Sequence, residues 1–467
     1  MKVSAKKISA AVSLAVMSAG ISMNAGAAGF ALIENSASGM GNAFAGAAAI
    51  AEDASTIWFN PAGMTKLSGS QIVIAGHIIS PTADFTNNGS TTNTAQPLSG
   101  GDDDGGQTGF VPNFYYVKNL GNDVVFGVGV NAPFGLATEY DENWVGRYTA
   151  LESEVMTINI NPSFAMKATN KLSVGFGLNI QYIEATLSNK LDSAAICQGR
   201  LVPLGVPSTT CDSAGLTVAE IGNPTLDSNL DSAQSLSGDD WSTGFNLGFL
   251  YDIDDASRLG VAYRSSIKQK LEGDVNFDMN AGLAAIISGL PSPYNTLFPG
   301  STGVQSTIEL PESISVSYYR DVDAKLAFLA DITWTRWSNF EELAIVFDPI
   351  QPASIVPEDW ENSFRYSLGI NYKHNDTMTY RAGIAYDETP IKSPAERTPR
   401  IPGNDRTWLS LGFGYNMSSD MSIDVGYSHL FVDDTDMDNT DASFGHTVTG
   451  TYEASVDILS AQLNMKF

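Results

Sequence analysis

The feature that most constrains the fold is a two-residue alternation of side-chain character that recurs from about residue 70 to the C-terminus. In 173–182, large apolar side chains alternate with Ser, Gly, Asn and Gln, and the same pattern returns in 364–372. Successive side chains of a β-strand point to opposite faces. Each run therefore predicts a strand that separates an apolar environment from one lined by small or polar groups.

The connections between these runs distinguish a barrel from a soluble sandwich. We predict about fourteen strands, near 70–80, 109–118, 123–136, 153–167, 171–187, 240–251, 257–277, 309–320, 324–346, 362–373, 377–387, 406–416, 420–431 and 453–467. Short turns alternate with long segments such as 188–239 and 278–308, which is typical of outer-membrane barrels. We therefore predict an all-β fold, a transmembrane up-and-down antiparallel β-barrel over residues 70–467.

The two ends of the chain indicate the compartment. Lys2, Lys6 and Lys7 precede an apolar run over 8–21 and the small residues Ala25-Gly26-Ala27, which predicts a signal peptide over residues 1–27. The last strand alternates and stops on Phe467, which resembles the assembly signal of outer-membrane barrels. We predict a multi-pass protein in the outer membrane of a Gram-negative bacterium.

Residues 28–69 lie between the signal peptide and the first strand. They are rich in Gly, Ala and Ser, have no regular period, and turn at Asn60-Pro61-Ala62. A barrel of about fourteen strands encloses a bore wide enough for water. We therefore predict that residues 28–69 fold inside the barrel as an N-terminal hatch, because small residues allow close packing against the wall.

The third predicted strand is interrupted. Its alternation ends at Asn131-Ala132-Pro133-Phe134-Gly135. Proline cannot donate a ladder hydrogen bond and glycine weakens a strand, so strand pairing should fail here. Pro112 and Pro162 lie in the two neighbouring strands. The residues alone leave two interpretations open, a local failure of strand pairing within a closed wall or an ordinary bulge near a rim.

Charge and cysteine content narrow the class of protein. The net charge of -27 excludes nucleic acid as a partner. Runs such as Asp102–Asp104 indicate solvated loops, and calcium binding stays an alternative, although no loop has EF-hand spacing. In an exported chain, Cys197 and Cys211 predict a loop disulfide. A free or metal-bound pair is the alternative.

Three stretches together identify a family resemblance. Residues 28–64, with Asn60, Pro61 and Ala62, resemble the N-terminal hatch of the FadL family of outer-membrane long-chain fatty acid transporters. The interrupted third strand and residues 398–410 resemble further parts of that family. The resemblance implies uptake of a long-chain fatty acid or a similarly hydrophobic small molecule. It also implies sideways release into outer-membrane lipid through a gap formed by Asn131, Pro133, Phe134 and Gly135.

The resemblance further implies basic lumen residues that neutralise the ligand's carboxylate. Counting alternate residues along each predicted strand places Arg264, Lys268, Arg365 and Arg381 on the lumen face. An inward arginine can instead pair with a neighbouring carboxylate. The family's carboxylate-holding positions fall near Glu184 and Glu361 here. This departure leaves uptake of aromatic or aliphatic hydrocarbons as an alternative.

Other classes of protein have less support. The four histidines accompany no recognisable nucleophile motif, so we expect no enzyme, no catalytic residue, no cofactor and no metal. A structural or adhesive surface barrel and a general porin are alternatives, and we expect a monomer. The run 281–290 predicts a short apolar helix, either lining a ligand groove or packing in the interior.

Overall fold

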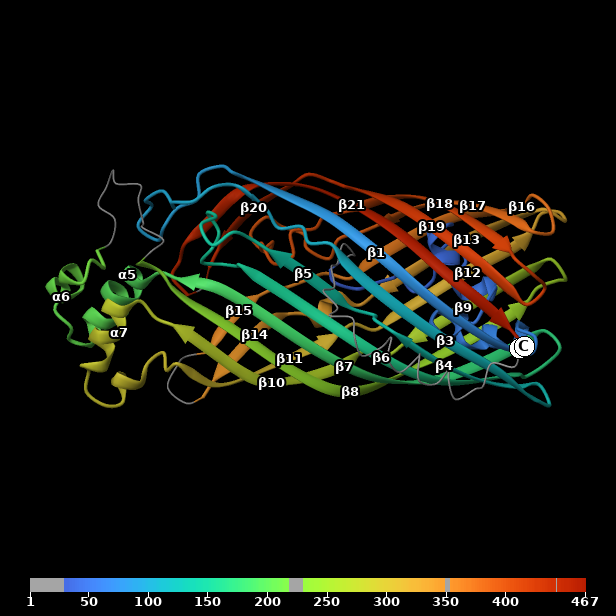
Figure 1. Cartoon of the computed structure of the whole chain (residues 1–467), viewed down its shortest axis with the longest axis horizontal. Coiled ribbons are helices and arrows are strands. Elements are labelled where there is room, and N and C mark those ends of the chain that lie inside the picture. Colours follow the sequence, from blue (N-terminus) through green and yellow to red (C-terminus); the bar gives the residue numbers. More distant parts are fainter. Residues whose placement is uncertain (1–28, 218–229, 349–352, 442) are drawn as a thin grey trace, which may run out of the picture.

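The computed structural model describes residues 29–217, 230–348, 353–441 and 443–467. The predicted signal peptide lies outside the described residues. The chain forms one closed antiparallel β-barrel (Figure 1). It closes where β1 (Ser70–Asn87) pairs with β21 (Thr447–Lys466), from Gln71 opposite Lys466 to Asn87 opposite Gly450.

Fourteen passes make up the barrel, as predicted. Between β1 and β21 they are β3 (Gly109–Gly121), β4 and β5 (Val124–Asn131, Gly135–Glu139), β6 (Glu152–Lys167), β7 (Leu172–Leu191), β8 (Ser232–Asp252), β9 and β10 (Ser257–Arg264, Ile267–Asp278), β11 and β12 (Ser301–Leu310, Ser313–Asp321), β13 and β14 (Leu326–Thr335, Glu342–Phe347), β15 and β16 (Ser354–Pro357, Ser363–Lys373), β17 (Met378–Asp387), β18 (Arg406–Asn416), and β19 and β20 (Met421–Val432, Thr435–Thr440). The short strand β2 (Asp103–Asp104) pairs with β1.

The alternation predicted from the sequence is visible in the exposure of the side chains. On β16, Phe364, Leu368 and Ile370 are exposed, whereas Arg365 and Ser367 between them are buried. The apolar face of such a strand therefore points outward to lipid, and the small and polar face points to the lumen.

Several predicted strand ends are wrong. Residues 81–87, 232–239 and 301–308 were expected in loops but belong to β1, β8 and β11. These strands extend toward the end of the barrel that carries the helices α5, α6 and α7 (Figure 1). The alternation that marks a membrane strand weakens where neither face needs to be apolar, so periodicity predicts the membrane-crossing part best.

The N-terminal segment (residues 29–69) lies inside the barrel, near the end where the chain terminates (Figure 1). It contains α2 (Ala37–Met40), α3 (Ala47–Ile50), α4 (Thr56–Phe59) and the 3-10 helix η1 (Pro61–Lys66). Its backbone approaches the wall closely at glycines. A methyl group on Gly260 would lie 2.0 Å from the carbonyl oxygen of Ala48, and one on Gly383 would lie 2.2 Å from that of Asn42.

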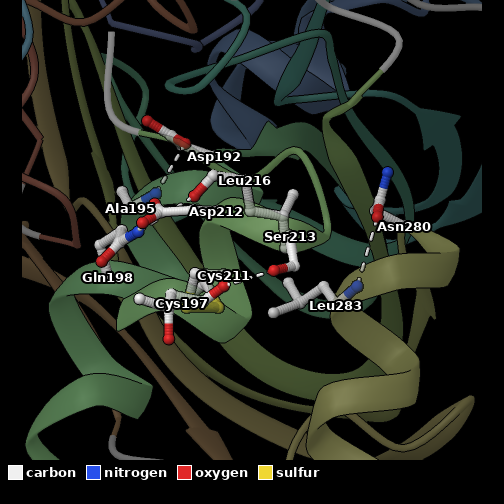
Figure 2. Close-up of a disulfide and its surroundings, with 11 residues drawn as sticks. Asp192, Ala195, Cys197, Gln198, Cys211, Asp212, Ser213, Leu216, Asn280 and Leu283 are labelled. Atoms are coloured by element: carbon white, nitrogen blue, oxygen red, sulfur yellow. Dashed lines mark hydrogen bonds between the residues drawn. A yellow bond between two sulfur atoms is a disulfide. The ribbon is translucent and has the colours of Figure 1, made fainter. Parts of the chain in front are cut away.

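The opposite end carries a small helical cap. Its elements are α5 (Ser193–Ala195), η2 (Ile196–Leu201), η3 (Val202–Leu204), α6 (Ser208–Ser213), α7 (Ala281–Ser288) and η5 (Tyr294–Thr296), and η6 (Trp337–Asn339) lies between β13 and β14. Figure 2 shows the disulfide between Cys197 and Cys211, which joins η2 to α6. Both cysteines are buried in an apolar cluster under these helices. Leu283 and Ile287 of α7 are buried in that cluster too, so α7 packs in the interior of the cap.

No helix among the described residues is long and apolar enough to cross a membrane.

Candidate functional site

The third pass of the barrel is broken between β4 and β5. β3 pairs with β4 from Phe114 opposite Val130 onward, and its residues 109–113 pair only with β1 among the described strands. Pro112 lies in this one-sided stretch, where one edge of the strand has no ladder partner. The structure places Pro133 and Phe134 in the break itself.

The neighbouring proline interrupts a different ladder. Pro162 of β6 lies opposite Val128, and the pairing of β6 with β7 stops at Ile160 and resumes at Ser163. The three prolines predicted to mark an opening therefore lie in three adjacent passes.

The N-terminal segment supplies hydrogen bonds that the broken pass lacks. The Leu32 amide donates to the Pro133 carbonyl (2.8 Å), and the Gly135 amide donates to the Phe30 carbonyl (2.9 Å). The Thr157 hydroxyl donates to the Phe134 carbonyl (2.6 Å). Because buried backbone groups need partners, residues 30–32 act as a substitute strand for the break.

Five buried aromatic side chains gather beside the break. We call Phe30, Phe134, Trp337, Phe340 and Trp360 the aromatic partition. The Phe30 ring lies 5.0 Å from that of Trp337, and the Phe340 ring lies 4.9 Å from that of Trp360. Such edge-to-face contacts are favourable. Phe30 and Phe340 line one cavity, and Phe134 and Trp337 line a second, so the partition lies between the two.

The outer cavity has a volume of about 110 Å³. Its wall is mainly aliphatic and includes Leu136, Val155, Ile183, Leu236, Leu271, Val304 and Ile308, together with Phe30 and Phe340 of the partition. Glu358 and Arg400 contribute the charged groups of this wall. A cavity of this composition suits an apolar ligand.

The donors of Arg400 are engaged by the protein itself. Nη1 donates to the Glu152 carbonyl (3.0 Å) and the Ser153 hydroxyl (2.8 Å). Nη2 donates to the carbonyls of Thr149 (2.8 Å) and Ser188 (3.2 Å). Arg400 therefore ties the loop after β17 to the rim formed by β6 and β7.

Glu358 lies between β15 and β16. Its Oε2 accepts a hydrogen bond from Trp360 Nε1 (3.0 Å). Burial raises the pKa of Glu358 to about 8, although the Trp360 hydrogen bond and the charge of Arg400 act in the opposite direction. At neutral pH this carboxyl group is mostly protonated, so Arg400 carries the charge of the outer wall.

The inner cavity has a volume of about 170 Å³. Residues of the N-terminal segment form much of its wall, including Leu32, Ile33, Phe44, Ala47, Trp58 and Phe59. Pro133 and Phe134 of the broken pass also line it, and so do Arg264, Asp331, Arg365 and Asp387. The inner cavity therefore borders both the N-terminal segment and the break.

The predicted carboxylate-binding residues differ in their surroundings. Arg264 donates to Asn179 Oδ1 and the Trp58 carbonyl (2.7 Å each), and its guanidinium lies 3.3 Å from the centroid of a Trp58 ring. Arg381 lies outside both cavities, paired with Glu52 (2.5 Å) and Asp424 (2.8 Å). Arg365 lines the inner cavity.

The predicted inward orientation of Lys268 is wrong. Its side chain is exposed, between buried Ile267 and Gln269. β9 ends at Arg264 and β10 begins at Ile267. This interruption shifts the alternation by one residue, so a parity counted from Arg264 gives the wrong face.

Asn60-Pro61-Ala62 attaches the N-terminal segment to the wall. Asn60 Oδ1 accepts from the Ala62 amide (3.0 Å), and its Nδ2 donates to the carbonyls of Ala48 (2.6 Å) and Phe249 (3.0 Å). Pro61 begins η1. Apart from Phe134, the sequence analysis did not identify the members of the aromatic partition. It also did not identify Glu358 and Arg400 as cavity residues. The only signal near Arg400 was the family-like stretch 398–410.

Comparison with known proteins gives consistent results. The family model described as "Outer membrane protein transport protein (OMPP1/FadL/TodX)" matches residues 18–467. A long-chain fatty acid transport protein of Escherichia coli O6:H1 (strain CFT073) is 32% identical over 419 residues, which cover 89% of this chain and 90% of that protein. Outer membrane protein P1 of Haemophilus influenzae (strain KW20 / Rd) is 30% identical over 419 residues, which cover 87% of this chain and 86% of that protein.

Solved structures support the barrel fold. A Pseudomonas aeruginosa FadL homologue matches with a TM-score of 0.83 at 24% identity, covering 94% of this chain and 100% of that one. The Pseudomonas putida toluene transporter TodX matches with a TM-score of 0.63 at 17% identity, covering 89% and 94%. The expected family and outer-membrane location are confirmed: the chain belongs to the outer membrane protein transport protein family (OMPP1/FadL/TodX).

Proposed function

We propose that this protein takes up long-chain fatty acids or similarly hydrophobic small molecules across the outer membrane and releases them sideways into outer-membrane lipid. One observation carries the proposal: the inner cavity is walled partly by the N-terminal segment and partly by Pro133 and Phe134 of the broken pass. A ligand in that cavity lies beside the gap in the ladder. The name of the E. coli relative agrees with this substrate class.

The outer cavity is suited to capture. Binding of an apolar ligand against its aliphatic wall is favoured by a free energy of roughly 25 cal/mol for each Å² of apolar surface buried. The aromatic partition then separates a captured ligand from the inner cavity. A displacement of Phe30, which belongs to the N-terminal segment, would connect the two cavities.

The N-terminal segment acts in this proposal as a hatch over residues 28–69. It is held in the lumen by Asn60 and by the Arg381–Glu52 pair, so a straight path along the bore is blocked. The lateral opening is formed by Asn131, Pro133, Phe134 and Gly135. The process needs no catalytic residue and no cofactor, and one chain closes the barrel, which favours a monomer.

A second substrate class has its own supporting observation. Both Nη atoms of Arg400 donate to protein oxygens, so the only arginine in the wall of the outer cavity has few donors left for a carboxylate. An aromatic or aliphatic hydrocarbon would suit that cavity equally well. Binding of labelled oleate and labelled toluene to the purified protein compares the two classes directly.

The test of lateral release is a double substitution, Pro133→Val with Gly135→Val. Strand-forming residues should restore pairing across the break, so uptake of labelled oleate by cells should be abolished while binding by purified protein persists. Pro81→Val is the matched control, because Pro81 lies in the fully paired ladder of β1 and β21. Unchanged uptake in the double variant would contradict lateral release.

Two further measurements address the other classes of function. A porin would conduct ions steadily in a planar bilayer, whereas a barrel filled by its N-terminal segment should conduct almost none. A structural or adhesive barrel would bind neither oleate nor toluene.

A further inference from the structure

The disulfide of the helical cap is enclosed by parts of the chain that lie far apart in the sequence. Cys197 and Cys211 are each 0% exposed, and the chain contains only these two cysteines. Leu216 follows α6, and Leu283 of α7 lies between β10 and β11, in the same apolar cluster (Figure 2). Phe444, which precedes β21, belongs to that cluster too. The sulfur atoms are therefore enclosed only after three loops have met.

Polar contacts hold the cap against the loop that precedes β21. His446 Nε2 lies 3.1 Å from Asp192 Oδ2, and Asp192 Oδ1 accepts from the Ala195 amide (2.8 Å) at the start of α5. Arg200 Nη2 donates to the Ser443 carbonyl (3.0 Å). Since β21 pairs with β1 where the barrel closes, these contacts need the last pass in place. Docking of the cap therefore accompanies or follows closure of the barrel.

The segment between the cysteines has little regular structure that could form alone. The cysteines are 14 residues apart, and the helices η2, η3 and α6 have six, three and six residues. Isolated helices shorter than about 12 residues are marginal in water. A covalent link removes conformational freedom from the unfolded segment, and neither cysteine belongs to a strand. The bond therefore stabilises the cap rather than the ladders of the barrel.

Burial also limits when the bond can form. Thiol–disulfide exchange needs a thiolate that an attacking or leaving sulfur can reach. The long loops of an outer-membrane barrel face the outside of the cell, whereas the oxidants of disulfide formation act in the periplasm. In the assembled protein, Cys197 and Cys211 are thus both enclosed and on the far side of the membrane from the periplasm.

We propose that a periplasmic thiol oxidase forms the Cys197–Cys211 bond before the barrel closes, and that the bond is needed by the cap but not by the barrel. The thiolate of one cysteine attacks the disulfide of the oxidase and forms a mixed disulfide. The thiolate of the other cysteine then displaces the oxidase, which leaves as a dithiol. One S–S bond forms in this chain and one breaks in the oxidase, so two electrons and two protons pass to the oxidase.

The first test follows the unaltered chain in pulse-labelled cells. Because there are only two cysteines, a polyethylene glycol maleimide reports on this bond alone: a reduced chain gains mass and an oxidised chain does not. Resistance to unheated SDS separates assembled barrels from unassembled chains. We expect unassembled chains to be oxidised already, and to be reduced in cells that lack the periplasmic thiol oxidase. Reduced unassembled chains beside oxidised barrels, or unchanged oxidation without the oxidase, would overturn the inference.

The second test measures access to the bond in the purified, assembled protein. Reduction by dithiothreitol should be roughly 100-fold slower in the folded protein than after unfolding in heated SDS, because a buried bond reacts only after local opening. Equal rates in the two states would show that the sulfur atoms can be reached after assembly, and would overturn the proposed order of events.

The third test asks what the bond stabilises. Cys197→Ser with Cys211→Ser should still give an SDS-resistant barrel in wild-type amount. Trypsin added outside the cells should cleave the cap after Arg200, the only basic residue between the cysteines, roughly 100-fold faster than in the wild-type protein. Mass spectrometry after reduction detects this cleavage.

Ser213→Ala is the matched control for the double variant. Ser213 is an exposed residue of α6 whose hydroxyl donates to the Thr209 carbonyl (2.7 Å), so this substitution changes the same helix and keeps the disulfide. Its cap should resist trypsin as the wild-type cap does. A cap that stays resistant in the double variant, or a barrel that fails to assemble without the bond, would overturn the assignment of the bond to the cap.

Discussion

The outer and inner cavities lie on either side of the aromatic partition but are built from different parts of the molecule. Phe30 is the only residue of the N-terminal segment in the wall of the outer cavity, whereas that segment supplies much of the inner wall. The outer wall is mainly aliphatic. The inner wall contains two arginines and two aspartates.

This difference separates two tasks. The outer cavity is formed mainly by barrel strands and loops, with Phe30 alone from the N-terminal segment, so it should change less when that segment moves and can hold a ligand before passage begins. A cavity walled by the N-terminal segment changes with every displacement of that segment. In the proposed function, capture therefore belongs to the outer cavity and release to the inner one.

The largest effect is expected for Arg381→Met. This substitution should loosen the N-terminal segment, which lines the inner cavity, and leave the strands and loops that form the outer cavity in place. Arg381 is 5% exposed and pairs with Glu52 of the N-terminal segment and with Asp424 of β19. The side chain of Asp424 is 6% exposed, so removing Arg381 leaves a buried carboxylate unpaired, which costs about 3 to 5 kcal/mol. Glu52 is about a third exposed and adds less. Thermal unfolding in detergent should show this loss, and planar-bilayer conductance should rise.

Arg336→Met is the control for that variant. Arg336 pairs with Glu312 but is half exposed, so its loss should cost about 1 kcal/mol or less. Equal destabilisation by the two substitutions would show that the buried pair does not hold the N-terminal segment.

The fold itself was largely predictable from sequence, and the reasons are local. On β16, exposed Phe364 and Leu368 alternate with buried Arg365 and Ser367, and this period is read directly from neighbouring residues. Lys268 shows the limit of such reasoning, because one interruption between β9 and β10 reverses every later assignment of face.

The cavities could not be predicted in the same way. The aromatic partition combines residues from the N-terminal segment, the broken third pass and two loops, near 30, 134, 337 and 360. No spacing in the sequence relates these positions. Glu358 and Arg400 lie outside the strands and follow no period, so only the three-dimensional arrangement shows that they line one cavity.

Phe30→Ala should weaken the outer cavity and open the partition. The Phe30 ring contacts four aromatic rings and lines the outer wall. Loss of about 1.5 to 3 kcal/mol of apolar contact corresponds to roughly a 10- to 100-fold weaker affinity for a hydrophobic ligand. Equilibrium binding of labelled methyl oleate in detergent measures this change.

The matched control is Phe444→Ala. Phe444 is also a buried aromatic residue, but it belongs to the cluster under the helical cap and lines neither cavity. Methyl oleate affinity should be unchanged in this variant. If Phe444→Ala weakens binding as much as Phe30→Ala, the outer cavity is not the capture site.

Glu358 should make the outer cavity sensitive to pH, with a smaller effect. Its pKa of about 8 lies above its ordinary value of 4.5 because of burial. The part of the folding free energy that depends on protonated Glu358 is fully present below pH 4.5 and is lost as the pH rises through 8, where the folded protein must hold a buried carboxylate. Methyl oleate does not titrate, so a loss of affinity between pH 7 and 9, about tenfold at most, would report ionisation of the cavity. Glu358→Gln should bind equally at both pH values, and a pH dependence that persists in this variant would assign the titration to another group.

The smallest effect is expected at the end of the N-terminal segment farthest along the chain from Phe30. Lys66 pairs with Asp252 of β8, and each side chain is about a quarter exposed, at 24% and 25%. A pair of this exposure contributes about 1 kcal/mol or less, and salt screens it. Lys66→Met should therefore lower the unfolding midpoint slightly at low salt and not at high salt, with methyl oleate affinity of the outer cavity unchanged.

Because η1 packs close to the wall through Asn60 and Ala62, the segment should stay in place. A large rise in bilayer conductance for Lys66→Met would show instead that this exposed pair, rather than the buried Arg381 cluster, holds the wall of the inner cavity.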